Sequence, residues 1–147
     1  MLHNYRVRAA AEADLAEIAK TEALCFSDPW SEASLASHMA GDGGILLICE
    51  GEDGALGYLS ARALPPECEI YRVATLPAHR RCGVGSALLA ALFETAAGVN
   101  SFFLEVRENN TPAISLYKAH GFTELARRKN YYRNPKEDAL ILGKEQM

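Results

Sequence analysis

The feature that most constrains this chain is a short basic loop with two glycines, Arg-Arg-Cys-Gly-Val-Gly at residues 80–85. It lies between an apolar run (residues 70–76) and a run with helical spacing (residues 86–97). The first N–H groups of a helix have no partner within the helix, and the helix dipole is positive at that end. Gly83 and Gly85 also allow positive φ and a close approach of ligand to backbone. The loop therefore predicts a binding site for phosphate or pyrophosphate.

Two common phosphate-binding motifs do not fit this loop. A Walker-type loop would need a lysine after the glycines, and none is present. A dinucleotide fingerprint would need a third glycine where Leu88 stands, and residues 77–81 separate the glycines from the strand. Glu105, about 20 residues further on, is the one point in favour of a dinucleotide site. Nucleotide-like cofactors of another kind fit better.

Length and composition limit the remaining possibilities. The chain has 147 residues, 49% of them hydrophobic, which suits one domain spanning residues 1–147. No apolar run reaches the ~18 residues of a membrane span, and the polar start does not resemble a secretory signal. The four cysteines form no Cys-x-x-Cys pair, and the four histidines have no ligand spacing. With a net charge of −4, we expect a cytoplasmic protein without a metal, a membrane partner or general nucleic-acid binding.

The hydrophobic pattern predicts the element order βααβββαβαββ. Helices are expected from Asp14, from a Ser31 cap to about residue 40, over residues 86–97, and from a Thr111 cap to residue 121. The strand, helix and strand over residues 67–106 predict that the fourth and fifth strands are parallel neighbours. The other strands are expected near residues 4–9, 45–49, 56–63, 122–128 and 139–143.

Two residues near the expected cofactor loop suit proton transfer. Glu105, near the end of the fifth strand, could accept a proton from a nucleophile, and Tyr117, on the next helix, could give one to a leaving group. A backbone N–H around residues 73–75 could bind the oxyanion. The residues alone leave alternatives open. Glu105 could be a solvated acid, Tyr117 a core aromatic, and Glu67 or Glu69 the base.

The pattern Arg-x-x-Gly-x-Gly, matched by Arg80, Gly83 and Gly85, resembles the loop with which GNAT acetyltransferases hold the pyrophosphate of acetyl-CoA. The resemblance is closest to the RimI type and covers nearly the whole chain in one order. Its matching segments are residues 29–32, 80–85, 104–107, 110, 113–114, 116–117, 121–122, 127–128, 130–132 and 137–139. Leu76 stands where that family usually has an aspartate, and Cys82 where it usually has a polar residue.

This resemblance implies a fold, a cofactor and a set of site residues. The fold would be α+β, the GNAT or acyl-CoA N-acyltransferase fold, with a mixed sheet of about seven strands flanked by helices. The parallel fourth and fifth strands would form the acetyl-CoA cleft. Glu105 would be the general base and Tyr117 the general acid, while Trp30, Tyr131 and Tyr132 would border the acceptor. The implied contacts to acetyl-CoA are Val73, Ala74, Thr75, Arg80, Arg81, Cys82, Gly83, Val84, Gly85, Ser86 and Asn110.

The implied activity is acetyl transfer from acetyl-CoA to a protein N-terminal α-amine, above all the N-terminal alanine of a small-subunit ribosomal protein. Two alternatives stay open: a small amine or lysine side chain as acceptor, and a non-catalytic acyl-CoA-binding module. The basic and aromatic residues 127–133 have a composition seen at RNA-binding surfaces, although a hairpin covering the sheet edge explains them as well. The sequence leaves the oligomeric state open, and a monomer is compatible with it.

Overall fold

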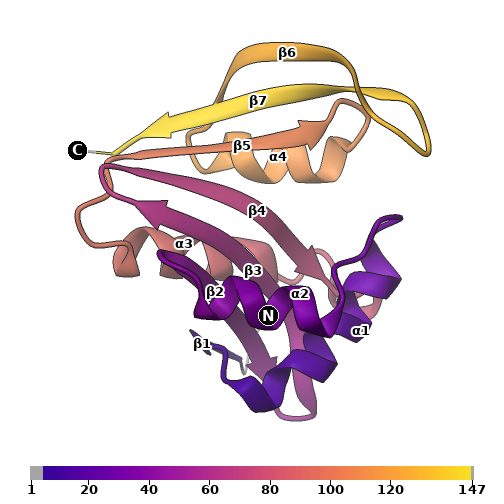
Figure 1. Cartoon of the computed structure of the whole chain (residues 1–147), viewed down its shortest axis with the longest axis vertical. Helices are drawn as coiled ribbons and strands as arrows, with labels where there is room; N and C mark the ends of the chain where they lie inside the picture. The colour runs from indigo at the N-terminus through magenta and orange to yellow at the C-terminus, as the bar shows by residue number, and fades with distance from the viewer. Residues whose placement is uncertain (1–4, 147) are drawn as a thin grey trace.

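The computed structural model describes residues 5–146. A central sheet carries helices on both faces (Figure 1). The α-helices are α1 (Leu15–Cys25), α2 (Glu32–Ala40), α3 (Val84–Thr95) and α4 (Thr111–Ala119), and short 3-10 turns cover Glu12–Asp14 and Pro77–His79. The strands are β1 (Arg6–Ala9), β2 (Gly44–Gly51), β3 (Gly54–Leu64), β4 (Glu67–Thr75), β5 (Ser101–Arg107), β6 (Thr123–Tyr132) and β7 (Glu137–Glu145).

The seven strands form one sheet in the order β1-β2-β3-β4-β5-β7-β6. Every neighbouring pair is antiparallel except β4 and β5, which are parallel and are connected through α3. The expected element order, the mixed sheet and the parallel fourth and fifth strands are thus confirmed.

The helices cover the sheet unequally. Leu15 and Ile18 of α1 and Leu35 of α2 pack with β2, β3 and β4 on one face. On the opposite face, one larger core joins α3, through residues such as Leu88, to α4 and to strands of both halves of the sheet. Figure 1 shows α4 behind β5 and β7, while α1 and α2 lie on the near side of the other half. Within residues 5–146, the near face of β5 and β7 therefore carries no helix.

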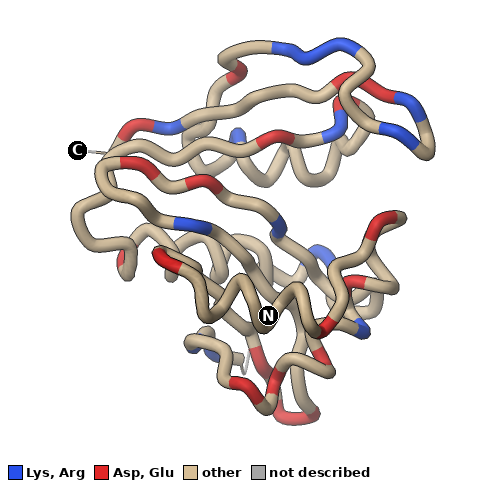
Figure 2. The backbone as a smooth tube through the Cα atoms, in the orientation of Figure 1, with Lys and Arg blue, Asp and Glu red and all other residues tan. Residues whose placement is uncertain are grey.

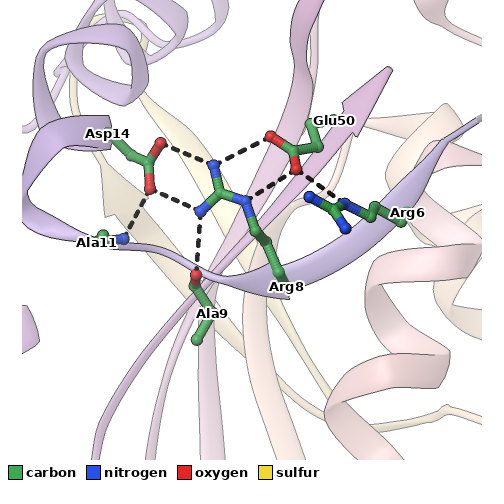
Figure 3. A network of polar contacts seen from close by, with 6 residues as sticks. All are labelled: Arg6, Arg8, Ala9, Ala11, Asp14 and Glu50. Atoms are coloured by element: carbon green, nitrogen blue, oxygen red, sulfur yellow. Dashed lines mark hydrogen bonds and ion pairs between the residues drawn. The ribbon is translucent and has the colours of Figure 1, made fainter. Parts of the chain in front are cut away.

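An ion-pair network holds the N-terminal edge strand to the sheet (Figure 3). Arg8 of β1 makes paired hydrogen bonds of 2.8 and 2.9 Å to the Asp14 carboxylate and also binds Glu50 of β2. Asp14 accepts a further hydrogen bond from the Ala11 N–H, and Arg6 joins at Glu50. These contacts connect β1, β2 and the turn that leads into α1.

Several helix ends differ from the expectation. In α4 the cap is Asn110, whose side chain accepts from the Ala113 N–H, so the expected Thr111 is already the first helical residue. α3 starts at Val84, two residues earlier than expected, because Gly83 takes the left-handed conformation (φ 83°) that begins the helix. The same helix ends at Thr95, and Gly98 follows only after a short turn.

Candidate active site

β4 and β5 pair along only part of their length. The parallel register runs from Glu67 opposite Ser101 to Ile70 opposite Leu104. At that point β4 contains a bulge, since Arg72 lies opposite Ser60 and Ile70 opposite Ala61, which leaves Tyr71 without a partner in β3. Beyond the bulge the two strands diverge, as Figure 1 shows. The backbone edges that face each other there are left without a strand partner.

The separated part of β4 directs hydrogen-bond donors toward β5. Because the Leu76 N–H bonds to Leu56 of β3, alternation along the strand turns the backbone groups of Val73 and Thr75 to the opposite edge. The Thr75 carbonyl accepts from the Arg80 Nε at 3.3 Å, which ties the basic loop to the end of β4. N–H groups placed in this way can stabilise an oxyanion.

The start of α3 forms the anion cradle that the glycine loop predicts. Arg81 and Gly83 both have positive φ, 65° and 83°. Within residues 5–146 no side chain caps α3, whereas Ser31 caps α2 and Asn110 caps α4. The first N–H groups of α3 are therefore left for another acceptor. A Cβ at Gly85 would lie 2.8 Å from Leu116 Cδ2, so a side chain at this position would require Leu116 to move. These features fit a pyrophosphate group.

Glu105 lies on β5 just beyond its last pairing with β4. Its neighbours Leu104 and Val106 are buried in the core beneath the sheet, so its own side chain points to the face that has no helix. Arg128 of β6 approaches it, with Nε 3.6 Å from Oε1. Hydrogen bonding to Glu105 also raises the pKa of Tyr131. A half-buried carboxylate with a cation and a phenol beside it can accept a proton from an amine.

A second carboxylate lies next to Glu105. Glu69 projects from β4 opposite Phe103, and burial together with the charge of Glu105 raises the pKa of Glu69. Figure 2 shows acidic positions side by side on β4 and β5, and basic positions along β6 and its turn into β7. Glu67 lies two residues further back, at the start of the strand pairing. Of the two alternative candidates for the general base, Glu67 and Glu69, only Glu69 lies beside Glu105.

Tyr117 has its ring in the core and is only 6% exposed. It packs edge-on against Phe122, with 5.6 Å between ring centroids. Burial, and then the nearby Tyr132 phenol, raise the pKa of Tyr117, so the hydroxyl keeps its proton throughout the neutral range. Tyr117 is thus both a core aromatic and a protonated hydroxyl close to the residues at the end of β6.

The three predicted acceptor-side aromatics belong to two groups. Trp30 stacks with Tyr71 of β4 and with His38 of α2, at centroid distances of 5.9 and 5.4 Å. Tyr131 and Tyr132 meet edge-to-face at 5.1 Å at the end of β6. Burial, with a further contribution from Glu105, raises the pKa of Tyr132 to about 12. Trp30 borders the β4 side of the separation, and the tyrosines border the β5 side.

Three predicted cofactor residues use their side chains within the protein. The side-chain oxygen of Asn110 caps α4. The Ser86 hydroxyl lies 3.0 Å from His120 Nε2, between α3 and α4. The Cys82 thiol contacts the Arg80 carbonyl at 3.7 Å. For a ligand, Ser86 and Cys82 can therefore offer their backbone groups, and Asn110 can offer its side-chain N–H₂ group.

Sequence reasoning missed two arginines that shape the site. Arg72, on β4, contacts the segment between α1 and α2. Arg107, on β5, donates to the carbonyls of Arg133 and Pro135 in the turn after β6, and its guanidinium lies 4.4 Å from the Tyr132 ring centroid. Arg72 had a detectable signal, since it is the only charged residue in the apolar run 70–76.

Other types of site were also sought in residues 5–146. No group of three His, Cys, Asp or Glu side chains there could hold a metal ion, and no helix there is long and apolar enough to cross a membrane. A hollow of about 410 Å³ lies at the far end of β5, between Glu67, Phe103, Leu125 and Ile141. Of the candidate catalytic and cofactor residues, its lining includes only the alternative base Glu67.

Comparison with known proteins agrees with this geometry. The model of the "Acetyltransferase (GNAT) family" matches residues 15–122. The [ribosomal protein bS18]-alanine N-acetyltransferase of Haemophilus ducreyi is 30% identical over 142 residues, which cover 93% of this chain and 97% of the relative. The crystal structure of the ribosomal-protein-S18-alanine N-acetyltransferase from Escherichia coli superposes with a TM-score of 0.88, at 29% identity, over 97% of this chain and 95% of the other. The chain is also 33% identical, over 90% of its length, to the Mycobacterium leprae protein ML0378, of which it spans only 38%.

Proposed function

Because this chain belongs to the acetyltransferase (GNAT) family, we propose that it transfers the acetyl group of acetyl-CoA to the α-amine at a protein N-terminus. The acceptor we propose is the N-terminal alanine of a small-subunit ribosomal protein, as in the names of the Haemophilus and Escherichia relatives. Residues 1–147 would act as one acetyltransferase domain. The observation that carries the proposal is the position of Glu105 at the point where β5 leaves β4, on the edge of β4 to which the N–H groups of Val73 and Thr75 turn.

The residues that would hold acetyl-CoA are the β4 edge and the start of α3. The N–H groups after Gly83 would bind the pyrophosphate, with Arg80 and Arg81 beside them. Bound there, acetyl-CoA supplies an activated thioester. The β4 N–H groups would lie along the thioester, where donors to a developing oxyanion contribute a factor of about 10²–10³ in rate.

Proton transfers would fall to two side chains on opposite faces of the β5 half of the sheet. Glu105 would take a proton from the attacking amine, directly or through a water, a role that contributes about 10²–10⁴ in rate. Tyr117, protonated at neutral pH, would donate to the departing thiolate. An α-amine has a pKa near 8 and a lysine side chain one near 10.4, so a single carboxylate base suits the former better.

The test is mass spectrometry of short peptides incubated with acetyl-CoA and the protein. One peptide has a free N-terminal alanine, and a second has a blocked N-terminus and an internal lysine. We expect acetylation of the alanine α-amine alone. Glu105→Gln should slow it by about 10²-fold or more, whereas Glu108→Gln should not. Glu108 is the matched control because it pairs with Arg127 at 3.1 Å on the outside of the same region.

Each alternative has its own outcome in this assay. Acetylation of the internal lysine alone would overturn the N-terminal acceptor and keep the acetyltransferase activity. Tight binding of acetyl-CoA without turnover on any peptide or small amine would favour a non-catalytic acyl-CoA-binding module. Equal activity of wild type and Glu105→Gln on the alanine peptide would remove Glu105 as the base.

A further inference from the structure

The segment between α1 and α2, residues 26–31, is held by one buried ion pair that the proposed chemistry does not use. Glu22, in the last turns of α1, is 0% exposed. Its Oε1 accepts a 2.7 Å hydrogen bond from the Trp30 N–H, and its Oε2 lies 3.4 Å from Arg72 Nε. Burial raises the pKa of Glu22, and the Trp30 N–H and Arg72 oppose that shift. A charge without exposure to water needs such partners to persist.

Arg72 contacts the same segment at several points. Its Nη2 donates to the Asp28 carbonyl at 2.9 Å, and its guanidinium lies 4.1 Å from the ring centroid of Phe26. The Trp30 ring is 5.8 Å away. The planar guanidinium with several N–H donors makes these contacts at once, which an ammonium group does not. One side chain of β4 thus holds the start, the middle and the end of the segment.

The position of Arg72 links this segment to the site. Arg72 follows the unpaired Tyr71 in the β4 bulge, where β4 leaves β5. A bulge turns consecutive side chains toward the same face, and here both Tyr71 and Arg72 contact Trp30. Arg72 also acts across the separation of the two strands. Its positive charge counteracts part of the rise in the pKa of Tyr132. Trp30 thus contacts Tyr71 of β4, and Tyr132 lies against Arg107 of β5, so the two aromatics border the two strands that separate.

We infer that Arg72, acting with Glu22, is a positioning residue that holds residues 26–31, and with them Trp30, as one wall of the acceptor site. This inference rests on the proposed function for the identity of the acceptor. It predicts that loss of Arg72 weakens productive binding of the acceptor and leaves acetyl-CoA binding intact, because the cofactor residues Arg80 and Thr75 meet this region at Cys25 of α1, a contact that does not involve Arg72.

The experiment compares Arg72→Met with Arg72→Lys and with the charge-neutral double variant Glu22→Gln/Arg72→Met. The amide introduced by Glu22→Gln can still accept from the Trp30 N–H, so the double variant leaves no buried charge unpaired. We expect kcat/KM for the alanine peptide to fall about 10- to 100-fold in both variants that lack the guanidinium, through a higher acceptor KM. The KM for acetyl-CoA should stay within about 3-fold, and Arg72→Lys should recover activity only in part.

The control is Arg8→Met, which breaks an ion-pair network of similar size away from the cleft (Figure 3). It should leave the acceptor KM unchanged.

A second readout needs no substrate. Trp30 is the only tryptophan of the chain, so fluorescence quenching by iodide reports its exposure directly. Quenching should increase in both variants without the guanidinium and stay at the wild-type level in Arg8→Met.

The outcomes separate the inference from the proposed function. Unchanged Trp30 quenching in the folded double variant would show that Arg72 does not hold the segment. Increased quenching with an unchanged acceptor KM would show that the segment is not an acceptor wall. Equal increases in the KM for peptide and for acetyl-CoA would also overturn the inference. If the wild type acetylates no α-amine, the proposed function fails, and the quenching data still decide whether Arg72 positions Trp30.

Discussion

Tyr117 is the residue whose surroundings bear most directly on its proposed role. Its ring stabilises the core beside Phe122, while its hydroxyl stays protonated because burial raises its pKa. The same burial that makes a phenol a core residue thus also keeps it a proton donor. The two interpretations that the sequence leaves open for Tyr117 are compatible.

Replacing Tyr117 by Phe should separate these two contributions. We expect kcat to fall about 10²-fold, because the hydroxyl is lost, and the free energy of unfolding to change by less than about 1 kcal/mol, because the ring remains. Steady-state kinetics with both substrates saturating and urea unfolding measure the two quantities. Tyr58→Phe is the control, since Tyr58 is 1% exposed and lies in the other core cluster. An unchanged kcat in Tyr117→Phe would contradict its role as the acid.

Glu105 and Glu69 are neighbouring carboxylates with different surroundings. Burial and the charge of Glu105 raise the pKa of Glu69. Glu105 instead has Arg128 beside it, with Nε 3.6 Å from Oε1. The charged form is thus disfavoured at Glu69, and the cation lies next to the carboxylate that is proposed as the base.

At the scale of elements, the start of α3 connects glycine conformation with cofactor binding. Gly83 holds φ at 83° and ψ at 9°, which a residue with a Cβ adopts at a cost of about 1 kcal/mol. A Cβ there would also lie 2.9 Å from the Tyr5 hydroxyl. Any side chain at position 83 therefore disturbs the turn that orients the free N–H groups.

Gly83→Ala should raise the KM for acetyl-CoA several-fold and leave the KM for the acceptor peptide unchanged. Gly54→Ala is the matched control, because Gly54 also has a positive φ (120°) but lies in the β2–β3 hairpin with no atom within 4 Å of a built Cβ. Both variants carry backbone strain, and only the first lies at the cradle. Equal KM values for acetyl-CoA in the two variants would show that this turn does not bind the cofactor.

The two strands that diverge at the site each carry an arginine that holds a loop. Arg72 of β4 binds the segment before α2, and Arg107 of β5 binds the turn between β6 and β7. Each guanidinium also lies over an aromatic ring, Phe26 in one case and Tyr132 in the other. The proposed acceptor side would thus consist of two loops, each held by an arginine of its own strand.

At the scale of the whole molecule, stability at low pH depends in part on the Arg8 network. Arg8 lowers the pKa of Asp14 to about 2, and the Ala11 N–H adds to this effect. A carboxyl whose pKa is lower in the folded state contributes stability above its unfolded pKa, near 4, and loses that contribution as the pH falls toward 2. Because Arg8 is partly exposed, we expect about 1–2 kcal/mol.

Asp14→Asn should therefore lower the free energy of unfolding by about 1–2 kcal/mol at pH 7. The difference between the variant and the wild type should shrink as the pH is lowered from 4 toward 2. Urea unfolding at a series of pH values measures it, with the exposed Asp53 replaced by Asn as the control. A difference that stays constant down to the lowest pH at which both proteins fold would contradict the assigned pKa.

The sequence by itself determined the order of the elements, the parallel central pair, the glycine turn before α3 and the places of Glu105 and Tyr117 along the chain. These features depend on local chemistry: alternating apolar residues, glycines that allow positive φ, and residues that cap or end helices. Even among these local features, the cap of α4 is Asn110 and not the expected Thr111. Asn and Thr are both good caps, so the backbone path decides between them.

Only the tertiary structure decided where β4 leaves β5, which neighbours surround Glu105, and that Glu22, Trp30 and Arg72 meet. A bulge depends on the register between two strands, and the Glu22–Arg72 pair joins residues that are far apart in the chain. Local patterns carry no information about such pairs, because they form only when the burial of whole helix and sheet faces fixes the register. The residues proposed to react and to border the acceptor could therefore be named from the sequence, whereas the contacts that position them could not.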